Sequence, residues 1–254
     1  AFGSATINVA RSTVSGVDDP DDAGTKTLQG DLMTVSIRNA RLYIGSGARL
    51  EDDATVAQFG TVVLPAANDP KAVGFSVDAG SLDLGILTAT RESSDGIAYN
   101  PLPIVRKYTG LQASLGKAQL QGVDAIKLIV RSFSIGINRT SVTGGDRLDW
   151  NQSSLSAAGL TLTNTSPTLQ IGGSAGFSIA NVVYGSATVD FSQRVVSGVD
   201  DPDDASTLQL KGSLLGLAIR NATLYIGSGA VLNEDSTLSN FGTVTPPASN
   251  DASA

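Results

Sequence analysis

A stretch of nine residues occurs twice in this chain without a single difference. Residues 14–22 read VSGVDDPDD, and so do residues 196–204. When the sequence is shifted by 182 positions, residues 3–69 align with residues 185–251 without a gap, and 40 of the 67 aligned positions are identical. Because the second copy stops partway through a period, we expect the chain to be a window from a longer tandem array.

A weaker repeat divides this long period roughly in half. The segment that starts at Val35 resembles the segments that start at Leu128 and Leu217, and the fourth residue of each is an arginine: Arg38, Arg131 and Arg220. An array that grew by duplicating a pair of units would read this way. We therefore predict three units, with residues 1–71 as unit A, residues 72–184 as a variant unit B, and residues 185–254 as a second, incomplete copy of unit A.

Apolar and polar residues alternate along most of the chain, which is the pattern of β-strands that turn one face to a core. In the first copy, apolar residues stand at positions 35 and 37 and then at 40, 42 and 44. A period of two cannot absorb a step of three without a bulge or a corner. The step recurs at the other two repeated arginines. We predict a bulge beside each arginine, closed by its guanidinium group against backbone carbonyls or an acidic neighbour.

The fold class that these patterns predict is all-β, in an elongated tandem-repeat architecture. Turn signals recur at short intervals and nothing between them supports a helix of any length. Two arrangements remain open. The uninterrupted joins between units and the scarcity of aromatic residues favour a stacked β-solenoid. The half-period of about ninety residues favours tandem β-sandwiches, because one sandwich domain takes about 100 residues.

The composition excludes most catalytic chemistry. The chain has no histidine and no cysteine, which removes imidazole bases, thiol nucleophiles, disulfides and the usual zinc ligands. A net charge of −7 offers no basic surface to nucleic acid or to an anionic membrane. No apolar run reaches the roughly 18 to 20 residues that a membrane helix needs. We expect a protein that is not an enzyme, binds no nucleic acid and does not insert into a membrane.

The repeated acidic turn is the best candidate for a ligand site. Clustered carboxylates are the hard oxygen ligands that Ca²⁺ uses at high coordination number, so Ca²⁺ is a candidate cofactor here. The spacing fits neither the EF-hand loop nor the glycine-rich nonapeptide repeat, which favours the alternative of a solvated turn whose charge protects a strand edge. The candidate metal ligands are Asp18, Asp19, Asp21 and Asp22 in the first copy and Asp200, Asp201, Asp203 and Asp204 in the second.

Two further features could contact a ligand. Tyr43 and Tyr225 occupy equivalent positions in the two copies, and we expect them to pack on a strand face, with stacking on a sugar as the alternative. The segment from Arg91 to Lys107 has the composition of a loop, with SSDG and NPLP motifs. Such a loop could recognise a glycan or a protein.

Three runs of sequence carry a resemblance to a known class of proteins. GLQASLGKAQLQGVDAI begins at Gly110, RLDW begins at Arg147 and FSVDAGSLDL begins at Phe75. These runs resemble the repeat units of giant bacterial exported proteins, the adhesin or haemagglutinin-like class. The resemblance implies an extracellular or cell-surface location and a role in adhesion or in surface filaments. It brings no catalytic residues.

The leading hypothesis is therefore a non-enzymatic structural repeat of a long, secreted bacterial protein, either an adhesin stalk or a filament. Its partners would be neighbouring repeats or subunits of the same protein. One alternative is a binding module for a surface glycan or protein. Another is a pilus-like subunit that assembles when an unpaired edge strand pairs with a neighbour.

Overall fold

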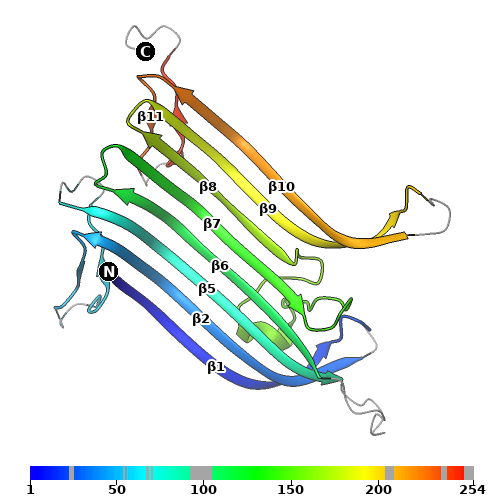
Figure 1. Cartoon of the computed structure of the whole chain (residues 1–254). Helices are drawn as coiled ribbons and strands as arrows, with labels where there is room; N and C mark the ends of the chain where they lie inside the picture. Colours follow the sequence, from blue (N-terminus) through cyan, green and yellow to red (C-terminus); the bar gives the residue numbers. More distant parts are fainter. Residues whose placement is uncertain are drawn as a thin grey trace.

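The chain folds around one large antiparallel β-sheet, which confirms the predicted all-β class (Figure 1). The structure is a computed structural model, and it describes residues 1–22, 26–53, 55, 57–66, 69, 71–91, 105–203, 209–235 and 239–248. Strands of all three predicted units belong to the same sheet. Within the described ranges, no helix is long and apolar enough to cross a membrane.

Eight long strands form this sheet, in the order β1-β2-β5-β6-β7-β8-β9-β10, and every neighbouring pair is antiparallel. The strands are β1 (Phe2–Asp18), β2 (Thr27–Ser46), β5 (Val73–Arg91), β6 (Arg106–Gln121), β7 (Ile126–Thr140), β8 (Leu169–Ile179), β9 (Val183–Asp200) and β10 (Gln209–Ile226). These eight strands lie in the sheet in their chain order, so each inner strand pairs with the long strands before and after it, and β1 and β10 are the two edges.

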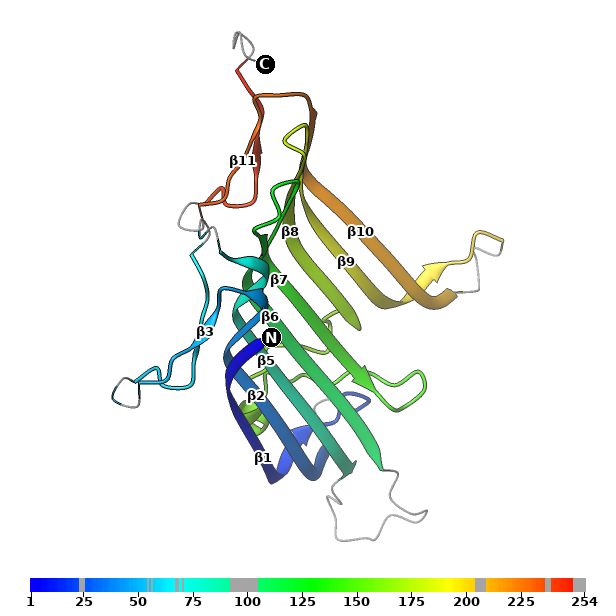
Figure 2. The same cartoon turned by 60° about the vertical axis from the view of Figure 1, so that its left-hand side comes forward.

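Two short hairpins and one 3-10 helix complete the structure. The hairpins consist of β3 (Arg49–Leu50) with β4 (Val62–Val63), and of β11 (Val231–Leu232) with β12 (Val244–Thr245). They follow β2 and β10, which are equivalent strands of the two copies, and they project from the same side of the sheet (Figure 2). The helix η1 (Ser153–Ala158) lies in the segment of residues 141–168 between β7 and β8, which we call the cover segment.

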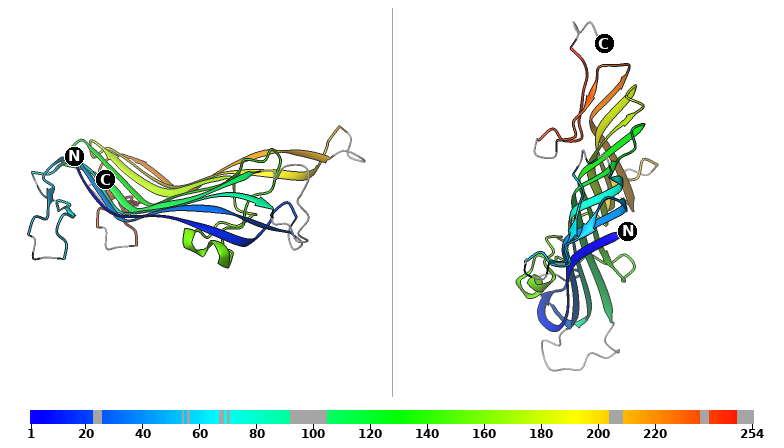
Figure 3. Two further views of the ribbon diagram at one scale, coloured as in Figure 1. Left: turned by 90° about the horizontal axis from the view of Figure 1, so that it is seen from below. Right: turned by 90° about the vertical axis from the view of Figure 1, so that its left-hand side faces the viewer.

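The sheet is bent near the middle of its strands (Figure 3). Asn39, Ser132 and Asn221 have positive φ angles of 51°, 51° and 50° at this bend, and the strand register shifts at each of them. Each follows one of the three repeated arginines directly, so the predicted bulges are confirmed. Bulges that the arginine pattern did not predict lie at Ala79 on β5, with φ 56°, and at the equivalent glycines Gly16 on β1 and Gly198 on β9, with φ 66° and 73°.

The arginines close these bulges as expected. Arg38 donates hydrogen bonds to the carbonyls of Ile37 and Leu82, at 3.0 and 3.1 Å, and pairs with the Asp83 carboxylate at 2.7 Å. Arg131 donates to the Ser239 carbonyl at 2.8 Å. Arg220 pairs with the carboxylate of Asp190. The three guanidinium groups thus bind the backbone carbonyls and acidic neighbours that the sequence predicted.

The cover segment packs on one face of the sheet and forms the main core. Trp150, Leu155 and Leu160 of this segment lie against Leu32 and Leu87 of the sheet, together with the other members of one buried cluster: Val17, Leu28, Ala89, Tyr108, Leu148, Ala158 and Leu162. A smaller cluster lies under the β11–β12 hairpin and contains Ile129, Tyr184, Ala230, Leu232, Phe241 and Val244. Both clusters lie on the same side of the sheet, where Figure 3 shows η1 and the hairpins.

A pair of glycines explains how Trp150 lies flat on the sheet. Gly85 and Gly110 face each other on β5 and β6, and a Cβ atom at either would come within 2.7 Å of the Trp150 ring. The Trp150 indole nitrogen donates to the Asn138 side-chain oxygen at 3.2 Å, and the Asn138 amide donates to the carbonyls of Leu148 and Thr163 at 2.9 Å. This buried network fixes the cover segment to the sheet.

The opposite face of the sheet is apolar across its whole width. Asp83 and Gly85 face the cover segment, so their alternating neighbours point the other way. One row of directly paired residues on this far face crosses all eight strands: Ile7, Ile37, Leu82, Ala113, Ile135, Ile171, Phe191 and Leu217. At the two ends of the row, Ile7 is 63% and Leu217 66% exposed. Apolar side chains thus extend across the whole width of the sheet on the face away from the cover segment.

Candidate interaction surface

The acidic turn of the first copy is held by arginines from two later strands. Asp19 is fully buried, and its carboxylate pairs with Arg91 at the end of β5 and with Arg106 at the start of β6, the latter at 2.8 Å. Arg106 also pairs with Asp21 at 2.7 Å. The cover segment adds a bond from the Asp146 amide to the Asp21 carboxylate at 2.7 Å. The turn is therefore a joint between β1, β5, β6 and the cover segment.

The electrostatics of this joint keep its arginine charged. Burial by itself lowers the pKa of Arg106, but Tyr108 and the carboxylates of Asp19 and Asp21 raise that pKa overall. Burial raises the pKa of the Tyr108 phenol, and the guanidinium of Arg106 beside it acts in the opposite direction. A buried carboxylate with two guanidinium partners is a well-compensated charge.

The identical turn of the second copy has different surroundings. The Asp203 amide donates to the Asp201 carboxylate at 3.0 Å, just as the Asp21 amide donates to Asp19 at 3.0 Å, so the local turn is the same. Asp201 is partly exposed, and within the ranges that the structure covers no arginine or lysine pairs with it. The turn thus has its local shape without its cationic partners.

The predicted calcium ligands that the structure describes have other partners or stand apart from one another. No group of three or more acidic side chains is arranged to hold a metal ion among the residues that are described. Asp19 and Asp21 bind arginines, and Asp22 pairs with Lys26 at 3.1 Å. Asp18 and Asp200 end their strands, while Asp204 lies outside the described residues. Calcium binding at these eight aspartates stays a prediction.

The two copies also differ in the burial of β2 and β10. Leu28 and Leu32 on β2 are fully buried, whereas their counterparts on β10, Leu210 and Leu214, are 45% and 54% exposed. The difference has two sources in the first copy. The outer edge of β2 pairs with β5 from Leu28 to Ser46, and the cover segment lies over both strands. In the described part of the chain, no strand pairs with the outer edge of β10.

At the opposite edge of the sheet, the edge strand is β1 of the first copy, and its equivalent in the second copy, β9, is paired on both sides. Strand β1 is equivalent to β9 in the repeat, and the outer edge of β9 is paired with β8. The outer edge of β1 has no partner strand within the described ranges. Unpaired edge strands present rows of free N–H and C=O groups that can pair with another strand. Each edge strand therefore has an internal copy whose outer edge is paired: β10 has β2, which pairs with β5, and β1 has β9, which pairs with β8.

Tyr43 and Tyr225 close the turns that follow β2 and β10. Tyr43 is fully buried and its hydroxyl donates to the Ser46 carbonyl at 2.8 Å, and the Tyr225 hydroxyl donates to the Ser228 carbonyl at 2.8 Å. Burial raises the pKa of the Tyr43 phenol, with a smaller contribution from Asp69. The predicted packing role is confirmed for Tyr43. The predicted recognition loop cannot be placed in the same way, since residues 92–104 lie outside the described residues.

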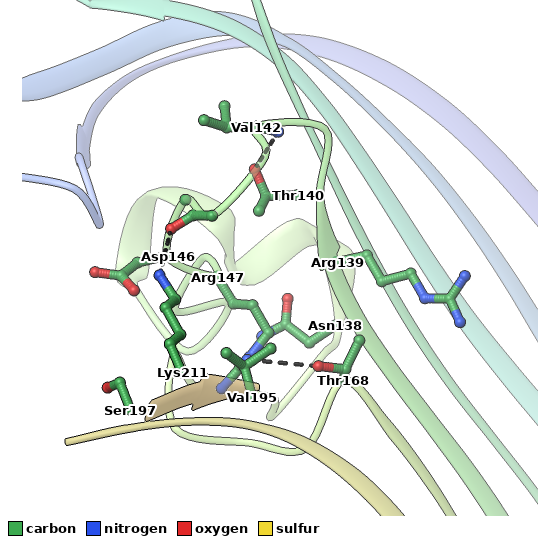
Figure 4. Close-up of a pocket in the computed structure, with 12 residues that line it drawn as sticks. Asn138, Arg139, Thr140, Val142, Asp146, Arg147, Thr168, Val195, Ser197 and Lys211 are labelled. Atoms are coloured by element: carbon green, nitrogen blue, oxygen red, sulfur yellow. Dashed lines mark hydrogen bonds between the residues drawn. The ribbon is translucent and has the colours of Figure 1, made fainter. Parts of the chain in front are cut away.

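A shallow pocket marks the junction between the cover segment and the second copy (Figure 4). Its volume is about 350 Å³, and Lys211 of β10 reaches across it to the Gly144 carbonyl at 3.2 Å. Arg147 on its floor donates to the Asn164 carbonyl at 3.0 Å. The pocket is where the cover segment of one period meets the first hairpin of the next.

Comparison with known proteins adds no relative. The sequence matches no protein-family model, and no curated protein or solved structure is significantly similar to it. Proposals about function therefore depend on the repeat and on the geometry described above.

Proposed function

We propose that this chain is a non-enzymatic structural repeat of a long extracellular or cell-surface protein, in which successive repeats extend one β-sheet. The observation that carries the proposal is the position of the second copy. The β9–β10 hairpin repeats β1–β2 in sequence, and it joins the same sheet directly beside β8. One period therefore adds six strands, after which the next period begins with the same hairpin.

This arrangement resembles a stacked solenoid more than tandem sandwiches, because the strands run across the direction in which repeats are added. Six strands at about 4.8 Å each advance the array by roughly 29 Å per period. The 20 residues of β2, at about 3.3 Å each, would make the ribbon roughly 66 Å wide. Each repeat contacts only its neighbours, so stability grows as a sum of unit and interface contributions. An adhesin stalk or a surface filament needs such a regular, cooperative body.

Electron microscopy of longer arrays tests this function. Arrays of two, four and eight periods should appear as ribbons whose length increases by roughly 29 Å per added period. Separate globules joined like beads, or particles whose length does not follow the number of periods, would contradict it. The location outside the cell is supported by the resemblance to exported adhesin repeats. Antibodies raised against the chain should label intact cells of the source organism, and labelling only after the cells are opened would contradict that location.

Assembly by strand addition is a second candidate, and the two unpaired edges favour it. Strand β1 and strand β10 lie at opposite ends of the sheet, and neither has an outer partner within the described ranges. The question that follows is which strand each edge accepts.

A further inference from the structure

We infer that the outer edge of β10 is a docking site for one kind of strand. This strand runs antiparallel to β10, has the alternating sequence of β5 and ends in an arginine, and it comes from the following repeat of the same protein. The inference rests on the proposed function, since it names the partner through which one repeat holds the next. Three independent observations point to this occupant.

The first observation is the register between β2 and β5. Strand β10 is the repeat of β2, and the outer edge of β2 is paired with β5 along almost its whole length. Moving these pairs by one period gives the expected contacts of β10 with the incoming strand. In β5 numbering, Leu210 should face Arg91, Leu214 should face Leu87, Leu217 should face Leu84 and Ile219 should face Leu82.

The second observation is charge. In the first copy, Arg91 at the end of β5 reaches the buried carboxylate of Asp19. The equivalent Asp201 has kept the same turn geometry without a cationic partner in the described part of the chain. An incoming strand that ends in arginine would place a guanidinium beside Asp201, as Arg91 lies beside Asp19. A pair of this kind, removed from water, fixes register as well as affinity.

The third observation is the repeated arginine of the bulge. Arg38 on β2 donates to the Ile37 carbonyl of its own strand and makes its other two hydrogen bonds to β5, at the Leu82 carbonyl and the Asp83 carboxylate. Arg220 on β10 has no such strand beside it and turns back to Asp190 on β9. Arg220, the equivalent of the arginine that binds β5 in the first copy, therefore lies on the edge strand β10.

The free edge of β1 would take a different strand. Strand β9, the repeat of β1, pairs with the 11-residue strand β8, which carries no charged residue. The two free edges therefore have different internal partners, and the repeat does not predict that β10 pairs with β1 of another copy. The experiment must therefore also detect pairing of β10 in one molecule with β1 in another.

The experiment uses the absence of cysteine in the chain. Directly opposed residues of an antiparallel pair have Cα atoms about 4.5–5.5 Å apart, which a disulfide can bridge. Leu217→Cys on the full chain is mixed with a synthetic peptide of residues 73–91 that carries Leu84→Cys, and disulfide formation is followed over time. A peptide with Asp83→Cys, whose thiol points to the other face, is the matched control. The full chain with both Val35→Cys and Leu84→Cys shows the rate limit for a formed pair.

We expect the Leu84→Cys peptide to cross-link at least about tenfold faster than the Asp83→Cys peptide. It should also cross-link more slowly with Val9→Cys on the β1 edge than with Leu217→Cys. Replacing Arg91 in the peptide by glutamate should weaken binding about tenfold or more, and Asp201→Lys in the chain should restore it. Equal cross-linking rates for the Asp83→Cys and Leu84→Cys peptides would overturn the inference. Unchanged binding after Arg91 is replaced by glutamate would also overturn it. So would self-association of the unmodified chain that cross-links Leu217→Cys to Val9→Cys.

A second measurement covers the case in which the free peptide aggregates. An extended chain, with a second copy of residues 73–184 placed after Ala254, carries Leu217→Cys and a cysteine at the added position equivalent to Leu84. Rapid disulfide formation supports the docking site, and no disulfide in a folded extended chain overturns it. Ribbons that lengthen with each period, without this disulfide, would overturn the docking register and leave the proposed function standing. Separate globules that nevertheless form the disulfide would support the docking register and contradict the proposed function.

Discussion

The glycine pair beneath Trp150 gives the sharpest test of how the cover segment is held. In Gly110→Ala, the new Cβ would lie 2.6 Å from Leu160 Cδ1 and 2.7 Å from Trp150 Cε2. Carbon atoms in contact are about 3.5–4.0 Å apart, so the ring and the leucine must each move by roughly 1 Å. Neither group is the end of a long flexible side chain, and Trp150 is fully buried. The strain therefore falls on the cover segment as a whole.

The expected magnitude is a difference between two opposing effects. Overpacking a filled core costs about 1–3 kcal/mol, while replacing glycine by alanine in a strand gains about 0.5–1 kcal/mol in backbone entropy. We expect Gly110→Ala to lower the free energy of unfolding by about 1–2 kcal/mol. Gly136→Ala is the matched control, because its Cβ would meet Leu162 at 3.5 Å and Gln170 at 4.0 Å, which are ordinary contact distances. It should raise that free energy by about 0.5 kcal/mol.

Urea unfolding followed by two signals separates the possible outcomes. Trp150 is the only tryptophan, so its fluorescence reports on the cover segment, while circular dichroism reports on the sheet. In Gly110→Ala the fluorescence maximum should shift to longer wavelength, and its urea midpoint should fall before the circular dichroism midpoint because the cover segment opens first. If Gly110→Ala and Gly136→Ala have equal urea midpoints and unshifted fluorescence maxima, the glycine pair does not hold Trp150.

Four other predictions follow from local features. Asp19→Asn should lower the free energy of unfolding by about 3 kcal/mol, because it removes the buried counter-charge that Arg91 and Arg106 share and leaves Arg106 with Asp21 alone. The same change at Asp201 should cost less than about 0.5 kcal/mol in chemical denaturation. Ala79→Gly should stabilise by about 1 kcal/mol because it relieves a positive φ, whereas Ala113→Gly, in regular strand, should destabilise by about 0.5–1 kcal/mol. Because the pKa of Tyr108 is raised in the folded state, its contribution to stability should be constant below about pH 10 and fall as pH rises above that value; Tyr108→Phe should remove this part of the slope. Chelation of calcium should leave the thermal midpoint unchanged if the turn is only structural, since arginines already pair with Asp19 and Asp21; a drop in the midpoint on chelation would support the predicted calcium binding.

Local regularities of the fold could be predicted from the sequence because they depend on neighbouring residues. The alternation of apolar residues identifies strands, and an odd step in that alternation identifies a bulge. The bulge at Ala79 was missed although a similar signal was present. Apolar residues at Val77 and Ala79 are followed by Leu82, and this step of three also exchanges the faces of the strand. The arginines marked three bulges but were not required for the bulge at Ala79.

Contacts between distant segments could not be predicted in this way. The partners of Asp19 lie 72 and 87 residues away along the chain, at Arg91 and Arg106, and only the sheet register brings them together. The flat site for Trp150 likewise depends on two glycines meeting across neighbouring strands. Alternation tells which residues share a face, but it does not tell what covers that face. For this reason the sequence left solenoid and sandwich open.

The repeat makes the chain its own control for the influence of surroundings on sequence. The acidic turn is identical in the two copies and β2 matches the β10 region at 12 of 20 positions, with leucine at both 32 and 214, yet Leu32 and Asp19 are buried while Leu214 and Asp201 are not. The difference is therefore supplied by β5, Arg106 and the cover segment, not by the repeated residues. The same substitution can be made at the equivalent position of each copy. The difference between its two effects on the free energy of unfolding measures the contribution of the surroundings. In a longer array, every copy followed by another period should behave like the first copy, which ties burial, stability and assembly to one interface.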